Sequence, residues 1–239
     1  MMIPLVYSLS IFGVALIGGI IPILIPGIRE DKLKLFVSLG AGLLLGMAFL
    51  HMIPESVEHI PHSFGLWLLV GFLCLLVIER FAMVHACEEH GCDYHTIGIA
   101  ALLGLTIHGI IEGFALASSL MSGIAPLVLI AILSHKAPAA FALTSILKLA
   151  GRTQTQIVAF TVAVALSVPM GMLAAYTVLE SGTVPGFAGI LLAMSSGTFI
   201  YIGACDLLPE LHRTNEDKFK RLGAFSVGLL ISYLAGLVV

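Results

Sequence analysis

The chain has 239 residues, of which 59% are hydrophobic and only 10% are charged, and its mean hydropathy is +1.10. A soluble protein of this length carries about a quarter charged residues, so the composition excludes a water-soluble globular domain and predicts a surface that faces the lipid bilayer. The net charge of −3 gives no indication of a nucleic-acid partner, and four scattered cysteines are too few for a disulfide framework.

Apolar stretches long enough to cross a bilayer recur along the whole sequence. A spanning helix needs about 20 mostly apolar residues, because only a helix satisfies its own backbone hydrogen bonds in lipid. The first stretch lacks the basic start and the cleavage site of a signal peptide, so we interpret it as a retained span. The predicted fold is an all-α polytopic membrane protein, one transmembrane domain over 1–239 with eight spans. These are expected near 3–25, 35–53, 65–84, 96–119, 125–148, 155–179, 187–209 and 222–239.

The basic residues predict how these spans are oriented. All eleven lysines and arginines except Lys136 lie in, or at the edge of, connections that follow odd-numbered spans. Cytoplasmic loops carry an excess of such residues, so we expect these connections in the cytoplasm and both termini outside. Compact loops without a targeting extension favour the plasma (inner) membrane of a bacterium or an archaeon.

Two of the predicted spans end in similar sequences. The second ends in HMIPE, with Gly42 nine residues before His51, and the seventh ends in DLLPE, with Gly197 nine residues before Asp206. The two spans run in opposite directions, and inverted repeats of this kind are typical of secondary transporters. Chance similarity is the alternative, because Pro-Glu is common at helix ends.

Ionisable side chains fall at bilayer depth, where each costs on the order of 2.5–3.5 kcal/mol and is therefore a functional candidate. They are His51, His108, Glu112, His135, Lys136 and Asp206. His108 and Glu112 are four residues apart, so both side chains lie on one helical face. Imidazole and carboxylate are a normal pair for Zn²⁺, and His135 of the next span could supply a third ligand.

Simpler interpretations of these residues stay open at this point. His108 and Glu112 could bond to each other, or Glu112 could pair with Lys136. Met47 lies one turn before His51 and could offer a thioether, although a methionine in a helix more often packs in a core.

Three segments resemble a known family. HGIIEGFALASS (108–119) and GTFIYIGACDLLPE (197–210) are similar to the fourth- and seventh-helix signatures of the ZIP (Zrt-, Irt-like protein) divalent metal transporters. HKAPAAFAL (135–143) resembles the fifth-helix signature of the branch that carries His-Lys there. The resemblance implies that inverted three-helix repeats flank spans four and five, which hold the transport site.

The same resemblance implies which residues bind the metal. His108, Glu112 and His135 become the expected ligands, and Asp206 is a further candidate. Span two contributes a ligand in some relatives, here Met47 or His51.

The sequence also departs from the pattern of many relatives, which hold two metal ions. They carry an Asn or a similar residue after the first His and carboxylates on the fifth helix, where this chain has Gly109, Lys136 and Ala139. An ammonium repels a second cation in a low dielectric, so we predict a single metal. Lys136 would stand in for the second ion and pair with Glu112 or Asp206.

A second group of soft and borderline ligands lies in the connection after span three. It comprises His85, Cys87, His90, Cys92 and His95. These side chains suit zinc and predict metal capture, and a solvated connector is the alternative.

The resemblance implies a membrane transporter, not an enzyme, that carries Zn²⁺ into the cytoplasm by alternating access. Its expected partners are the divalent metal ion and the lipid bilayer, with no resident cofactor. Imidazole and carboxylate also accept Fe²⁺, Mn²⁺ and Cd²⁺, so selectivity stays open. The alternatives are an intramembrane zinc-dependent hydrolase and a sensor or proton conductor that uses Lys136 and Asp206. The oligomeric state is not fixed, and a homodimer is one alternative.

Overall fold

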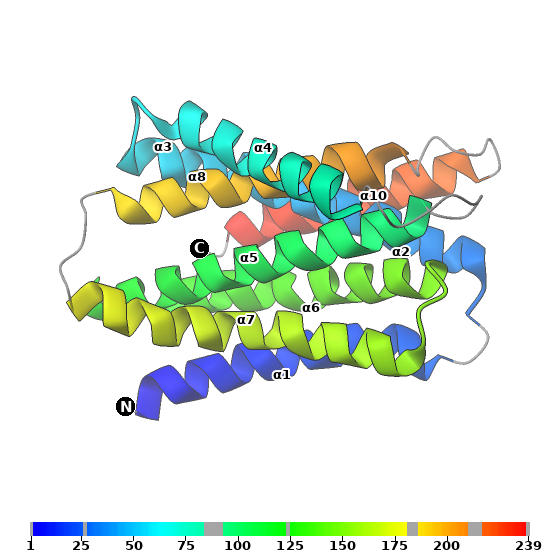
Figure 1. Ribbon diagram of the computed structural model, residues 1–239, viewed down its shortest axis with the longest axis horizontal. Helices are drawn as coiled ribbons and strands as arrows, with labels where there is room; N and C mark the ends of the chain where they lie inside the picture. The colour runs from blue at the N-terminus through cyan, green and yellow to red at the C-terminus, as the bar shows by residue number, and fades with distance from the viewer. Residues whose placement is uncertain are drawn as a thin grey trace.

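The computed structural model describes residues 2–25, 28–83, 93–122, 125–180, 186–209 and 217–237, and nearly all of them are helical. The long helices lie side by side with their axes roughly aligned (Figure 1). They are α1 (Met2–Leu24), α2 (Glu30–Met47), α4 (Phe64–Met83), α5 (Asp93–Ser122), α6 (Ala125–Leu149), α7 (Gln154–Glu180), α8 (Phe187–Ile200) and α10 (Lys218–Gly236). Helix α2 continues through the π-helix η1 (Ala48–Met52) into α3 (Ile53–His59), and α8 continues as the π-helix η2 (Tyr201–Leu207).

Within the described ranges, six helical segments are long and apolar enough to cross a membrane. They are Ile3–Leu24, Glu30–His59, Ala101–Leu120, Val128–Leu149, Gln154–Ala175 and Gly189–Leu207. Each overlaps a predicted span, which confirms the all-helical class. Helices α4 and α10 lie where the third and eighth spans were predicted but are not among the six, so the count of eight stays a prediction.

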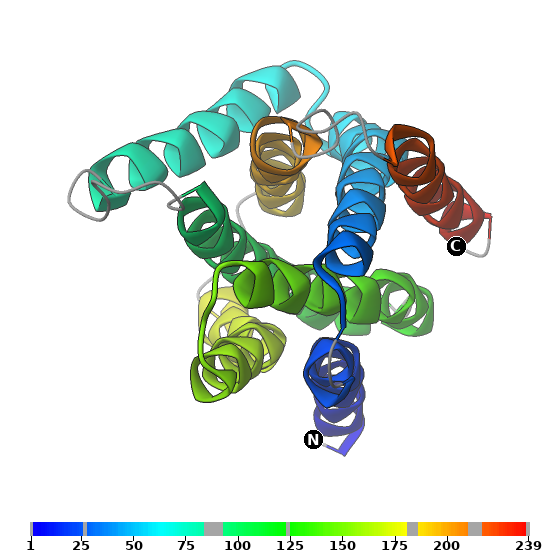
Figure 2. The same cartoon turned by 90° about the vertical axis from the view of Figure 1, so that its right-hand side faces the viewer.

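The long helices pack in two groups (Figure 2). In the first group, α1 packs on α6 and α7, and α7 packs on α5. In the second group, α2 packs on α10, and α4 packs on α8. The groups meet where α5 contacts α8 and α6 contacts α2.

Glycines allow the helices within each group to approach closely. A Cβ atom at Gly113 of α5 would collide with the backbone of α7, and one at Gly171 of α7 would collide with the backbone of α5. In the second group, Gly42 of α2 and Gly228 of α10 face each other's backbones in the same way. Small residues at helix contacts are the usual means of tight packing in membranes, where apolar side chains gain little by leaving lipid.

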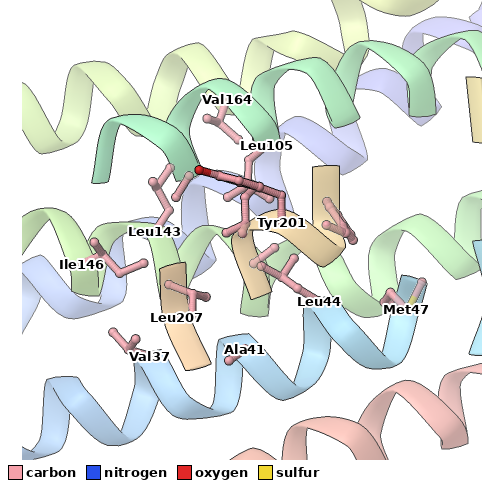
Figure 3. Close-up of a cluster of buried hydrophobic side chains, with 14 of the residues drawn as sticks. Val37, Ala41, Leu44, Met47, Leu105, Leu143, Ile146, Val164, Tyr201 and Leu207 are labelled. Atoms are coloured by element: carbon pink, nitrogen blue, oxygen red, sulfur yellow. The ribbon is translucent and has the colours of Figure 1, made fainter. Parts of the chain in front are cut away.

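Buried apolar side chains fill the junction between the two groups (Figure 3). The cluster includes Val37, Ala41, Leu44, Met47, Leu105, Leu143, Ile146, Val164, Tyr201 and Leu207. The outer faces of the assembly are apolar too, because leucines such as Leu9 of α1, Leu66 of α4 and Leu230 of α10 are more than half exposed. The interior is therefore packed, and the exposed leucines fit a lipid environment.

The two similar sequence endings share a local geometry. His51 lies in η1 and Asp206 lies in η2, and in both cases the second residue after the π-helix is a proline, Pro54 or Pro209. A π-helical turn is rare and often marks a functional position. The inverted-repeat relationship between the two halves stays a prediction.

Candidate metal centre

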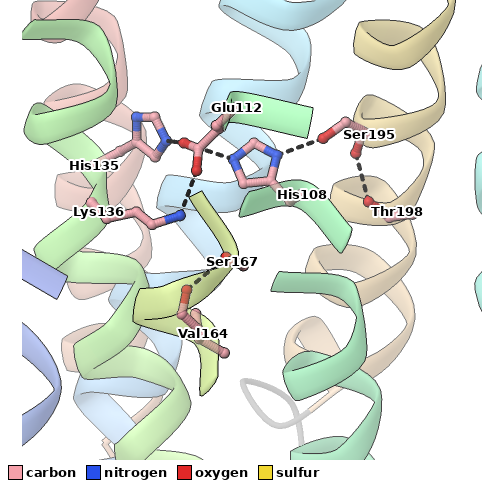
Figure 4. A network of polar contacts seen from close by, with 8 residues as sticks. All are labelled: His108, Glu112, His135, Lys136, Val164, Ser167, Ser195 and Thr198. Carbon is pink, nitrogen blue, oxygen red and sulfur yellow. Dashed lines mark hydrogen bonds and ion pairs between the residues drawn. The ribbon is translucent and has the colours of Figure 1, made fainter. Parts of the chain in front are cut away.

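Four polar side chains meet in the middle of α5 and α6 (Figure 4). His108 and Glu112 come from α5, one helical turn apart, and His135 and Lys136 are neighbours on α6. All four are buried, with exposed fractions between 3% and 7%. Four ionisable groups in an apolar interior need one another as partners, because an isolated charge there is very costly.

The Glu112 carboxylate connects the other three side chains. Its Oε1 atom lies 2.6 Å from Nε2 of His135 and 3.1 Å from Nε2 of His108. Its Oε2 atom accepts a hydrogen bond from Nζ of Lys136. The structure therefore pairs Lys136 with Glu112, one of the two partners that the sequence allowed.

The two histidines and the glutamate lie close enough together to hold a metal ion. Their ligand atoms, one from each of the three, all lie within 4.8 Å of one another. Ligands about 2.0–2.2 Å from a tetrahedral zinc ion lie about 3.4 Å apart, so small side-chain rotations would fit this set to an ion. Among the residues that the structure describes, His108, Glu112 and His135 are the one group of this kind.

The two nitrogens of His108 differ in their surroundings. Nδ1 lies 2.5 Å from Oγ of Ser195 on α8, while Nε2 faces Glu112 and has no hydrogen bond. Apart from the 3.1 Å contact with Oε1 of Glu112, Nε2 has no hydrogen-bond partner, so it is the ring nitrogen that is left to bind an ion. The His108 ring also packs against Phe199, with 4.0 Å between ring centroids.

Gly109 of α5 packs closely against Ser167 of α7, near Lys136. A Cβ atom at Gly109 would collide with Oγ of Ser167 and would lie 3.2 Å from Nζ of Lys136. A larger residue at position 109 therefore has no room here. The expectation of a single metal rests on the charge of Lys136 and stays a prediction.

The other predicted ligands lie outside this group. His51 Nε2 lies 2.7 Å from the backbone oxygen of Ser232 on α10, and Met47 belongs to the buried apolar cluster. Asp206 is buried in η2, and its Oδ2 atom has no hydrogen-bond partner. Metal binding by Met47, His51 or Asp206 stays a prediction.

The cluster of ligands predicted between positions 85 and 95 cannot be compared with the fold. Residues 84–92 lie outside the described ranges, and the side chain of His95 does too, although the backbone of α5 begins at Asp93. Metal capture by this connection therefore stays a prediction.

Sequence reasoning missed three residues of the site, namely Ser167, Ser195 and Phe199. A serine in a membrane helix commonly bonds to its own backbone, as Ser167 and Ser196 do here. The sequence gives no sign that Ser195 bonds to His108 instead. That contact depends on which helices pack together.

Comparison with known proteins places the chain among metal transporters. Residues 2–90 and 82–236 match the family described as ZIP Zinc transporter. The chain is 28% identical to zinc transporter ZIP9-B of Xenopus laevis over 91% of its own length and 89% of the relative's. It is also 28% identical to zinc transporter ZIP9 of Micropogonias undulatus, over 85% of each chain. A third relative, zinc transporter ZIP13 of Pongo abelii, is 28% identical over 96% of this chain and 76% of its own length.

Proposed function

The chain belongs to the ZIP zinc transporter family and is an integral membrane protein, and from this premise we propose that it carries zinc ions across a membrane through the buried centre on α5 and α6. In this proposal His108, Glu112 and His135 are the zinc ligands at the transport site. The relatives are named as transporters, which gives no support to the alternative of a zinc-dependent hydrolase.

The observation that carries the proposal is the position of one carboxylate oxygen between two imidazole nitrogens. Oε1 of Glu112 faces Nε2 of both His108 and His135, and these are the atoms that bind zinc in proteins. Lys136 holds the other oxygen, so the carboxylate is fixed with Oε1 toward the two histidines.

Lys136 also suits a site that must release its ion. Its positive charge opposes the zinc charge and competes for the same carboxylate, so the affinity is lower than Glu112 and two histidines alone would give. A transport site has to bind well enough to load and weakly enough to unload. In this role Lys136 replaces a second metal ion, and the site holds a single zinc.

Release requires movement, because the site is closed in this structure. The three ligands are each less than a tenth exposed, so an ion among them is shielded from water. We place the opening between the two helix groups, since α5 and α6 of the first group face α8 and α2 of the second. Movement of one group against the other would expose the site to each side in turn, as alternating access requires.

The proposal also covers the direction of zinc transport and the orientation of the chain in the membrane. We assign inward transport, toward the cytoplasm, with both termini outside and the chain in the plasma membrane. The basic connections after the odd-numbered spans support that orientation.

The test is uptake of radioactive zinc into liposomes that contain the purified chain. His108→Ala, Glu112→Gln and His135→Ala should each reduce uptake to the level of empty liposomes, because each removes a zinc ligand. His62→Ala is the matched control, since His62 is an exposed histidine between α3 and α4, and it should transport like the unaltered chain. Uptake that persists in His108→Ala and Glu112→Gln would contradict the proposal.

A further inference from the structure

Two residues of α8 contact the ring of His108, the proposed zinc ligand. Ser195 lies on the side of the ring away from Glu112 (Figure 4), and Phe199 packs against the ring. We propose that Ser195, supported by Phe199, is a positioning residue that fixes His108 for zinc binding. We further propose that this contact makes zinc affinity depend on the relative position of the two helix groups. The inference rests on the proposed function, because it assigns a role at the same site.

The hydrogen bond of Ser195 determines which His108 nitrogen can bind zinc. When Nε2 of the neutral ring binds zinc, the ring proton is on Nδ1, and Oγ of Ser195, 2.5 Å from Nδ1, is placed to accept that hydrogen bond. Nε2 is the atom that faces Oε1 of Glu112. A second partner on the other ring nitrogen is the usual way in which proteins set the tautomer and orientation of a histidine ligand.

Phe199 restricts the same ring by packing. It lies one turn after Ser195 on α8, and its ring is inclined by 42° to the His108 ring with 4.0 Å between centroids. Ser195 and Phe199 are both fully buried. One face of α8 therefore supplies both contacts, a hydrogen bond to the edge of the ring and an apolar contact to its face.

The contact between Ser195 and His108 joins the two helix groups. His108, Glu112 and His135 all come from α5 and α6 in the first group, so they keep their mutual positions if that group moves as a unit. Ser195 comes from α8, which belongs to the second group and packs mainly on α4 of that group. A shift between the groups would break the bond to Nδ1 and lower zinc affinity while the three ligands stay together.

A neighbouring serine provides a matched control. Ser196 is as fully buried as Ser195 and lies on the same helix. Its hydroxyl donates to the backbone oxygen of Leu192 in its own helix at 2.8 Å. Replacing Ser196 by alanine removes an equal volume and a hydroxyl without affecting His108.

The experiment measures zinc binding by titration calorimetry on the full chain in detergent, together with the KM and maximal rate of zinc uptake in liposomes. Ser195→Ala should raise Kd and KM about tenfold or more, the usual effect of removing such a partner. Ser196→Ala should bind zinc like the unaltered chain, and Ser195→Thr should restore most of the affinity because it keeps the hydroxyl. Phe199→Leu should raise Kd by about two- to tenfold through loss of the ring contact. Thermal unfolding without zinc should be alike for Ser195→Ala and Ser196→Ala.

Two results would overturn the inference. One is a Ser195→Ala protein that binds zinc within twofold of Ser196→Ala. The other is a Ser195→Thr protein that melts like the unaltered chain but binds zinc as weakly as Ser195→Ala. If the unaltered chain neither binds nor transports zinc, the proposed function itself fails. If it does both and Ser195→Ala does the same, only the inference fails.

Discussion

In the proposed function, Lys136 has two opposite effects on the centre. Without zinc its ammonium compensates the buried Glu112 carboxylate, and removal of one partner of such a pair typically costs about 3–5 kcal/mol. With zinc bound, the same ammonium repels the ion and competes for the carboxylate. Substitution at this position should therefore separate the stability of the protein from its affinity for zinc.

We predict that Lys136→Met lowers the thermal unfolding midpoint of the zinc-free protein and increases the rise in that midpoint when zinc is added. The rise is larger because zinc then replaces the missing positive charge beside Glu112 and meets no repulsion. Thermal unfolding followed with and without excess zinc measures both quantities.

Lys148→Met is the control for this prediction. Lys148 lies on the same helix, but its Nζ donates to the backbone oxygen of Pro22 on α1 at 2.8 Å. Its replacement can lower stability but should leave the zinc-induced rise unchanged. A Lys136→Met protein whose midpoint zinc raises less than that of the unaltered chain would contradict the role given to Lys136.

At the residue scale, the sequence predicted contacts between residues of the same helix, because helical spacing determines which side chains share a face. The separation of four between His108 and Glu112 places both on one face, and the structure brings them together with His135. Spacing within one helix says nothing about contacts from another helix. It could not choose between Glu112 and Asp206 as the partner of Lys136, and it could not find Ser195.

At the scale of the helices, the contacts within each group depend on glycines that face a neighbouring backbone. Backbone atoms cannot move aside as a flexible side chain can, so an added methyl group forces the helices apart. A Cβ atom at Gly228 of α10 would collide with the backbone of α2, whereas Gly223 of the same helix has open space around it.

We predict that Gly228→Ala destabilises the protein by about 1–3 kcal/mol, the usual cost of overpacking. Gly223→Ala should be neutral or stabilising by up to about 1 kcal/mol, because alanine is the better helix former. The unfolding free energies of both variants in detergent check this pair. Equal stability of the two variants would show that the α2–α10 contact is looser than the structure has it.

The helices themselves were well predicted because hydropathy reports directly on the length of an apolar stretch. The second and seventh spans were predicted as plain helices, yet each contains a π-helical turn at the position of the shared motif. A π-helical turn adds about one residue to a turn and leaves the composition unchanged, so hydropathy cannot detect it.

At the scale of the whole molecule, composition and basic residues predicted a membrane protein with both termini outside, while the division into two groups could not be predicted. Grouping depends on which faces meet, and almost every face of these helices is apolar. In this structure glycines mark the faces that meet within a group, and a search for small residues one or two turns apart is the signal that could have found them.

The proposed orientation, with both termini outside, makes a prediction for labelling in intact cells. In a variant whose four native cysteines are replaced by serine, His62→Cys should react with a membrane-impermeant maleimide. Gln154→Cys, at the first residue of α7 beside the connection from α6, should react only after the membrane is permeabilised. Both positions are exposed, so access to water is matched. The reverse pattern would place the termini in the cytoplasm.

The central claim is that a single zinc ion binds between α5 and α6. Anomalous X-ray diffraction at the zinc edge, from crystals of the full chain grown with zinc, tests it most directly. We predict one peak in the buried centre, within bonding distance of Nε2 of His108, Oε1 of Glu112 and Nε2 of His135. Two peaks beside Glu112, or a peak at Asp206 with none at Glu112, would contradict it.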